Sequence, residues 1–191
     1  MTAEDLISRL VAALDAADVP YMLTGSYASS IHSIPRATRD IDVIIFPNRD
    51  QLTRFVQSLP SSSYYADLED AIDSLRRRSQ FNVIDYATGW KVDFIIPPFE
   101  EFNIEEFERR QVIEVGNLKL SVVSPEDIVI AKLIWAKAGQ SERQLEDAAT
   151  VVRFQGEKLD VSYIDRWVRR LNLESQWATV REAGGLTSHR S

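Results

Sequence analysis

At 191 residues, with 45% hydrophobic and 27% charged residues, the chain is long enough to bury a core as one domain or as a domain with a helical annex. Its formal net charge of −7 argues against a protein that coats nucleic acid non-specifically, because that affinity comes mainly from lysines and arginines. The absence of cysteine excludes disulfides, thiolate catalysis and cysteine-based zinc sites, and two histidines are too few for a histidine-rich metal site.

The sequence gives no sign of a membrane segment. No stretch approaches the roughly 20 uninterrupted apolar residues of a membrane span. Residues 1–6 are acidic and lack the pattern of a signal peptide. We therefore expect a cytoplasmic protein with no membrane partner.

The N-terminal segment predicts a helix followed by a short strand. Thr2 and Asp5 have the spacing of a capping box, and the helix that they begin ends near Asp18. Its apolar stripe consists of Leu6, Leu10, Ala13, Leu14 and Ala17. Residues 19–20, Val-Pro, then turn the chain into a strand over 21–24.

Gly25 and Ser26 are predicted to form the turn of a phosphate-handling site. They stand between that strand and the opening of a helix over 27–33, whose free backbone N–H groups could bind an anion. Glycine would let a triphosphate approach the backbone, and the Ser26 hydroxyl could donate a hydrogen bond to a phosphate oxygen.

Asp40 and Asp42 are the most informative pair in the chain. They lie in the apolar run 39–46, which reads as a strand. Side chains alternate along a strand, so both aspartates leave one face while Ile41 and Val43 are buried on the other. Two carboxylates roughly 7 Å apart along one strand can hold one or two divalent cations.

The middle of the chain predicts further elements around these aspartates. Asn48 can cap a helix whose inner face contains Leu52, Phe55, Val56 and Leu59. Residues 97–110 are acidic and aromatic, and we interpret them as a loop with one helical turn. Residues 112–115 and 118–122, joined by Gly116-Asn117, predict a hairpin.

A third carboxylate has two candidates. Residues 80–86 and 90–96 read as two strands joined around Gly89, and each contains an apolar-Asp-apolar triplet. Asp93 is favoured because it lies in the more apolar strand directly after the turn, and Asp85 is the alternative. Asp93 could instead cap a loop or pair with Lys91 or an arginine.

The last third of the chain predicts helices. Ser124 is a strong N-cap for a helix over 125–138, with Pro125 at its first position and two acidic residues in its first turn. Further helices are expected at about 142–155, 161–171 and 174–182. Residues 184–191 begin with Gly-Gly and predict a disordered tail.

Several charged residues of these helices have two interpretations each. Lys132 is the one polar residue between Ile128 and Ala136. It either snorkels or forms a structural ion pair, or it reaches a nucleotide phosphate or the metal-site carboxylates. Arg143 and Asp147, four residues apart, form a helix salt bridge or contact a nucleotide. Three arginines on one side of a later helix are solvated or bind phosphate or RNA; they are Arg166, Arg169 and Arg170.

The motifs resemble a known family. The run from Leu23 to Ser26, thirteen intervening residues and then Asp-Ile-Asp-Val at 40–43 resemble the nucleotidyltransferase superfamily of DNA polymerase beta and kanamycin nucleotidyltransferase. Residues 36–42 and 124–132 look more like its bacterial branch with the abortive-infection AbiEii-type toxins. The resemblance covers about residues 5–150.

This resemblance implies an α/β (α+β) fold, in which a polymerase-beta-like core with a mixed sheet flanked by helices precedes a C-terminal helical annex. The core would comprise residues 1–122 and the annex 123–183. Asp40, Asp42 and Asp93 would be the catalytic residues and would hold two Mg²⁺ ions about 3.5 to 4 Å apart, with Mn²⁺ as an alternative ion. The implied nucleotide-binding residues are Gly25, Ser26, Arg36, Arg39, Lys132, Arg143 and Asp147.

The implied reaction is the transfer of a nucleoside monophosphate from an NTP to an acceptor hydroxyl, with release of pyrophosphate. The resemblance to toxins suggests the tRNA 3′ end as the acceptor. A protein or a small hydroxylated molecule would present a hydroxyl to the same metals. We also consider an antitoxin-like protein that nucleotidylates its partner, a cognate toxin or antitoxin, and an inactive nucleotide-binding module.

Overall fold

The computed structural model describes residues 2–34, 40–139 and 141–186. The chain forms two compact units. We call Met1–Tyr27 with Ala37–Val122 the sheet unit, and Ala28–Arg36 with Val123–Ser191 the helical unit. The predicted tail, residues 184–191, starts inside the last helix, and its residues 187–191 lie outside the described ranges.

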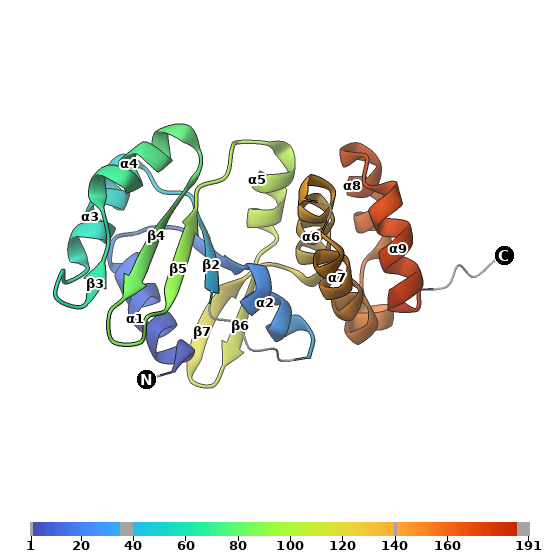
Figure 1. The fold of residues 1–191 in the computed structure, drawn as a ribbon, viewed down its shortest axis with the longest axis horizontal. Coiled ribbons are helices and arrows are strands. Elements are labelled where there is room, and N and C mark those ends of the chain that lie inside the picture. The colour runs from blue at the N-terminus through green and yellow to red at the C-terminus, as the bar shows by residue number, and fades with distance from the viewer. Residues whose placement is uncertain (1, 35–39, 140, 187–191) are drawn as a thin grey trace. The chain divides into compact units, whose positions relative to one another are not determined.

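The sheet unit contains one seven-stranded mixed sheet in the order β3-β4-β5-β2-β1-β7-β6 (Figure 1). Its strands are β1 (Tyr21–Thr24), β2 (Asp40–Ile45), β3 (Tyr64–Tyr65), β4 (Gln80–Asp85), β5 (Lys91–Ile95), β6 (Gln111–Val115) and β7 (Leu118–Val122). β2 and β5 are parallel, as are β1 and β7, and the other neighbouring strands are antiparallel. The prediction of a mixed sheet with flanking helices is confirmed.

The helices of the sheet unit are α1 (Ala3–Ala16), the first turn of α2 (Gly25–His32), α3 (Arg49–Ser58), α4 (Leu68–Arg77) and α5 (Glu101–Glu108). Three of them, α1, α3 and α4, begin at capping side chains. Thr2 with Asp5, and Asn48 with Gln51, form the capping boxes of α1 and α3. α5 has eight residues, which corrects the prediction of a loop with a single turn.

One face of the sheet carries the core of this unit. Ile41 and Val43 of β2 lie against the apolar side of α1, as predicted from the alternation of the strand. Phe94 of β5 stacks on Phe81 at 5.3 Å between ring centroids and meets Phe55 of α3 edge-on at 5.1 Å. The opposite face carries Asp40 and Asp42 of β2 and Lys91 and Asp93 of β5.

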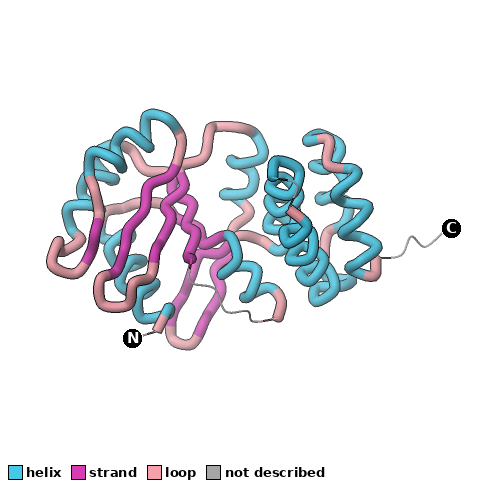
Figure 2. The backbone as a smooth tube through the Cα atoms, in the orientation of Figure 1, coloured by secondary structure: helices cyan, strands magenta, loops and turns pink. Residues whose placement is uncertain are grey.

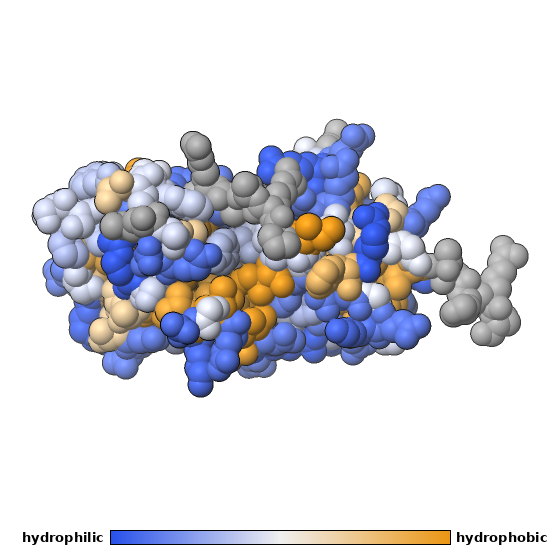
Figure 3. All heavy atoms as spheres, turned by 90° about the horizontal axis from the view of Figure 1, so that it is seen from below, coloured by the Kyte–Doolittle hydropathy of each residue, from blue (hydrophilic) through white to orange (hydrophobic). Residues whose placement is uncertain are grey.

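The edge strand β6 has polar protection. Val112 is 72% exposed on it. Exposed apolar side chains also occur elsewhere, and Figure 3 shows hydrophobic areas bordered by hydrophilic side chains on one face of the molecule. Glu114 of β6 pairs in register with Lys119 of β7, and their charged groups are 3.8 Å apart. Charged side chains on an edge hairpin discourage pairing with a second chain.

In its described residues the helical unit consists of helices and loops (Figure 2). Besides most of α2, it contains α6 (Pro125–Gly139), α7 (Glu142–Gln155), a short 3₁₀ turn (Gly156–Lys158), α8 (Val161–Leu171) and α9 (Glu174–Gly184). The four helices predicted from 125 onward are confirmed. Within the described ranges, no helix combines the length and apolar character needed to cross a membrane.

The first turn of α6 contains two buried acidic residues, Glu126 and Asp127, and a side chain of α8 donates a hydrogen bond to Asp127. Ser124 caps the helix, because its Oγ accepts from the backbone N–H of Asp127 at 3.1 Å and donates to the Asp127 carboxylate at 2.6 Å. The Tyr163 hydroxyl donates to the other oxygen of Asp127 at 2.5 Å. These bonds fix the start of α6 against α8.

His32, at the end of α2, is held inside the helical unit. Its Nε2 lies 2.6 Å from the carbonyl oxygen of Val123, and the Gln155 side chain donates to the His32 carbonyl at 2.6 Å. Burial lowers the pKa of His32 below its ordinary value of 6.5, although the bond to Val123 and the charge of Glu126 act in the opposite direction.

This pKa shift predicts a loss of stability in mild acid. The folded protein binds the proton of His32 more weakly than the unfolded chain does, so the contribution is complete above the unfolded pKa and is lost as the pH falls below it. We expect His32→Gln to remove this part of the pH dependence, measured as the difference between urea midpoints at about pH 7.5 and about pH 5.5. An unchanged difference in the variant would assign the acid sensitivity to other groups.

Candidate active site

The pairing of β2 with β5 brings the predicted carboxylates to one face of the sheet. Asp42 is the Cα partner of Asp93, Asp40 is the partner of Lys91, and the strands are parallel. Neighbouring strands lie about 4.8 Å apart, and residues in register point to the same side. Thr24 of β1, the partner of Asp42, joins them on this face.

Gly25 supports the approach of Asp42 to the start of α2. Its φ of 66° lies in the left-handed region, which favours glycine. A Cβ built on Gly25 would overlap the Asp42 carboxylate. Only a residue without a side chain therefore lets this carboxylate lie beside the helix terminus that carries Ser26.

Lys91 lies among these carboxylates. Its Nζ is 2.8 Å from Oδ2 of Asp93, and the Lys91 side chain is 42% exposed whereas that of Asp93 is 11% exposed. The hydrogen bond to Asp93 raises the pKa of Lys91, and the charges of Asp93, Asp40 and Asp42 add to the effect. The ammonium thus lies in the field of all three acidic groups.

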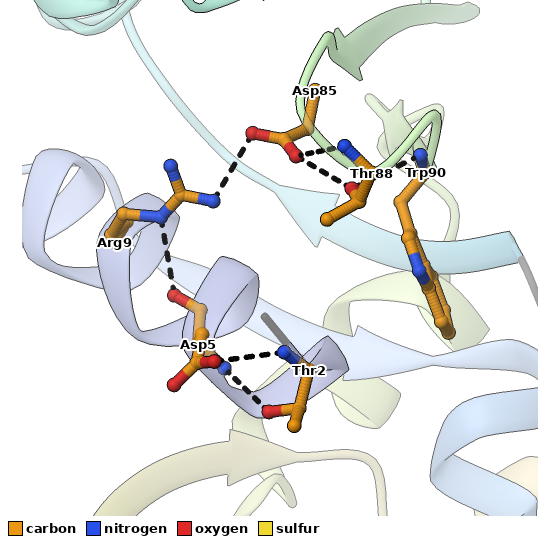
Figure 4. Close-up of polar contacts among 6 residues, drawn as sticks. All are labelled: Thr2, Asp5, Arg9, Asp85, Thr88 and Trp90. Atoms are coloured by element: carbon orange, nitrogen blue, oxygen red, sulfur yellow. Dashed lines mark hydrogen bonds and ion pairs between the residues drawn. The ribbon is translucent and has the colours of Figure 1, made fainter.

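Asp85, the alternative third carboxylate, points to the opposite face. Asn82 is the β4 partner of Asp93, so Asp85, three residues further along the strand, faces the other way. Figure 4 shows Asp85 with Arg9 of α1 and with Thr88 of the following turn. Its oxygens lie 3.1 Å from Arg9, 3.0 Å from the Thr88 backbone nitrogen and 2.5 Å from the Thr88 hydroxyl.

Asp85 is therefore expected to stabilise the fold rather than to act in catalysis. It is 1% exposed, and Asp85→Ala would leave the Thr88 donors without their acceptor. We expect the unfolding free energy to fall by about 2–3 kcal/mol. This value is lower than for a fully buried ion pair, because solvent screens the Arg9 side chain, which is 39% exposed. Asp73→Ala, which removes an exposed pair with Arg77, should change stability by less than about 0.5 kcal/mol. Urea unfolding measures both variants, and equal effects would contradict the assignment.

Asp40, Asp42 and Asp93 have the chemistry of a magnesium site. Carboxylate oxygens are the donors that Mg²⁺ and Mn²⁺ prefer, and the three residues share one face of two adjacent strands. Among the residues that the structure describes, no three acidic or histidine side chains are already arranged around a common metal position. The donor set fits the ion in type and in register.

Lys132 and Asp147 form a buried ion pair in the helical unit. The Lys132 Nζ lies 3.1 Å from the Asp147 carboxylate and 3.1 Å from Oε1 of Gln144. Their side chains are 4% and 15% exposed. The structural ion pair considered from the sequence is thus formed, with Asp147 bound to Lys132 across two helices. Nucleotide contacts by Lys132, Asp147 and the exposed Arg143 stay predictions.

Two predicted residues cannot be placed, and one site residue received no role from the sequence. Arg36 and Arg39 lie outside the described residues. Lys91 appeared only as a possible partner of Asp93. Its signal was its position two residues before Asp93, which gives both side chains the same face of one strand.

The chain has the fold of the nucleotidyltransferases. Its structure matches the antibiotic-resistance factor ANT(2'')-Ia with a TM-score of 0.57 at 15% identity, over 96% of this chain and 97% of that chain. An antigenic nucleotidyltransferase-like protein from Paracoccidioides brasiliensis matches with a TM-score of 0.52 at 16% identity, over 94% of each chain. The lincosamide antibiotic adenylyltransferase LnuA matches with 0.51 at 14% identity, over 79% of this chain and 96% of that chain.

Sequence comparison adds no closer relative. No family model matches the chain, and no curated protein matches it. At these identities the likeness establishes the fold alone, so the function must be argued from the residues of the site.

Proposed function

We propose that the protein is a Mg²⁺-dependent nucleotidyltransferase, which transfers a nucleoside monophosphate from an NTP to an acceptor hydroxyl. The observation that carries the proposal is the in-register pair of Asp42 and Asp93 on parallel strands, with Asp40 on the same face. The nucleotidyltransferase fold supports it, because the same fold occurs in a structure described as a lincosamide antibiotic adenylyltransferase.

In the proposed reaction, the acceptor oxygen attacks the α-phosphorus of the NTP and the bond from that phosphorus to the oxygen of the β-phosphate breaks. Pyrophosphate leaves, and Asp93 accepts the proton of the acceptor hydroxyl. Mg²⁺ bound by the carboxylates would lower the pKa of that hydroxyl and offset the charge of the triphosphate. The backbone at Gly25 and the Ser26 hydroxyl would position the β- and γ-phosphates.

Five other residues remain predictions for nucleotide binding. Arg36 and Arg39 would neutralise charge that develops on the phosphates. Lys132, Arg143 and Asp147 are the predicted nucleotide-binding residues of the helical unit. Resemblance to AbiEii-type toxins, a cognate antitoxin and a cytoplasmic location likewise stay predictions.

The acceptor that we favour is a small hydroxylated molecule, preferably a cationic one. The net negative charge of the chain falls entirely on the sheet unit, which contains the three carboxylates. Such a surface attracts cations and repels the phosphates of a nucleic acid. Among the structures with this fold, one contains adenylyl-2''-tobramycin and another contains lincomycin.

A tRNA 3′ end is the second candidate acceptor, because α8 presents cationic groups beside aromatic rings. The guanidinium of Arg166 lies 5.0 Å from the ring centroid of Tyr163, and that of Arg170 lies 4.7 Å from the ring of Trp167. Arg169 is exposed on the same helix. Both rings are buried, so this helix would bind RNA through contacts of its arginines with phosphates.

The test is incubation of the protein with Mg²⁺ and each α-labelled NTP in the presence of aminoglycosides, lincosamides, total tRNA or a cell extract. We expect label in a small hydroxylated product, with release of pyrophosphate, and no label with Asp40→Ala/Asp42→Ala. Label at the tRNA 3′ end would identify tRNA as the acceptor, and label in a protein would contradict both candidate acceptors. Absence of transfer from every NTP to every acceptor would overturn the proposal.

A further inference from the structure

Lys91 places a positive charge inside the proposed metal site. It shares its strand and face with Asp93, stands opposite Asp40 in the β2–β5 register, and binds Oδ2 of Asp93 at 2.8 Å. Asp42, the register partner of Asp93, completes the group of carboxylates around it. Lys91 therefore binds one of three acidic side chains that share a face of two adjacent strands and lies in the field of the other two.

We infer that Lys91 is a tethered counter-ion, which keeps these carboxylates together before a divalent cation binds. The divalent cation must displace the Lys91 ammonium in order to bind. This role rests on the proposed function, since it makes Lys91 a competitor for residues proposed as metal ligands. Like charges on neighbouring strands are destabilising, and an ammonium among them offsets that repulsion.

The Lys91 side chain is suited to leaving. Lysine is a compact charge on a flexible four-carbon stem, and this one is 42% exposed, so its head can move into solvent while the strand stays in place. Asp93, at 11% exposure, is the fixed partner. Displacement therefore requires a rotamer change of one side chain and no rearrangement of the sheet.

Competition of this kind favours a metal that arrives with a nucleotide. A divalent ion and an ammonium repel each other at short range, so a free ion binds more weakly than it would to the carboxylates alone. A triphosphate brings negative charge, which neutralises both the metal and the displaced ammonium. Lys91 thus makes the site selective for the metal–NTP complex over the free ion.

The first test measures Mn²⁺ binding by electron paramagnetic resonance, without NTP, in wild type and Lys91→Met. Removing the competitor should tighten Mn²⁺ binding by about 3- to 10-fold. Lys91→Arg keeps the charge and should stay near wild type. Lys119→Met makes the same change of net charge at an exposed lysine whose partner is 3.8 Å away, and should also stay near wild type. Equal changes in Lys91→Met and Lys119→Met would overturn the role of Lys91.

A second measurement uses only the wild-type protein, so it does not depend on how the variants fold. Acetic anhydride labels exposed amines, and mass spectrometry reports the label at each lysine. Saturating Mn²⁺ should raise the labelling of Lys91 about threefold or more while leaving Lys119 unchanged, because the displaced head loses its bond to Asp93. Unchanged labelling of Lys91 would overturn its displacement.

The two proposals fail in different ways. A wild-type protein that binds no Mn²⁺, with or without NTP, would overturn the proposed function together with the role of Lys91. Mn²⁺ binding that is equal in wild type and Lys91→Met would overturn the role of Lys91 and leave the transferase proposal standing.

Discussion

Asp42→Asn is expected to reduce kcat/KM for nucleotidyl transfer by about 10³-fold or more, because it removes one negative charge at the centre of the carboxylate group. Asparagine keeps the shape of the side chain, so the fold should be retained. Asp42 is paired with Asp93 on one side and with Thr24 on the other, which places it between β1 and β5. The measurement is the initial rate of pyrophosphate release with the acceptor that the labelling experiment selects.

A matched control separates the site from general charge effects. Asp50, in the first turn of α3, is exposed, and Asp50→Asn changes the net charge by the same amount. Its activity should stay within about twofold of wild type. If Asp42→Asn retained more than a tenth of wild-type activity, the carboxylates of β2 would not be the catalytic group.

Gly25→Ala is expected to damage both stability and activity. The added Cβ would overlap the Asp42 carboxylate, and the φ of 66° is strained for alanine. We expect a loss of about 2–4 kcal/mol in unfolding free energy and about 100-fold in kcat/KM, because the carboxylate and the helix start must move apart.

Gly89→Ala provides the control for strain alone. Gly89 has a φ of 70°, yet a Cβ there would meet nothing within 4 Å. It should cost about 1 kcal/mol and leave kcat/KM unchanged. Urea unfolding and steady-state kinetics report both variants. Equal losses in the two would show that the overlap with Asp42 contributes nothing.

The elements that the sequence predicts well are those with local signals. Capping residues, the spacing of apolar residues and the Gly116 turn identify α1, α3 and the β6–β7 hairpin. α4 is not among the helices that the sequence predicts, because its residues form an acidic run followed by arginines. Asp67 does cap it, by accepting from the backbone N–H groups of Glu69 and Asp70.

The arrangement of the site residues depends on strand register and on contacts between distant parts of the sequence, which local patterns do not contain. Asp85 and Asp93 occupy equivalent triplets, and only the β4–β5 register, with Asn82 opposite Asp93, places them on different faces. The partner of Asp147 is likewise non-local. The sequence favours the helical spacing to Arg143, whereas the structure joins Asp147 to Lys132 of a different helix.

Helix α2 has a consequence for dissecting the protein. Gly25–Tyr27 belong to the sheet unit, but the remainder of the helix belongs to the helical unit, where His32 contacts Val123 and Gln155. A fragment truncated after Val122 would keep α2 but lose Val123 and Gln155. His32, which is buried in the intact chain, would then be exposed to water. Each unit consists of two separate segments of the chain, so cutting the backbone once cannot separate the two units. Reassembly of the protein from two fragments would need at least one fragment that contains parts of both units.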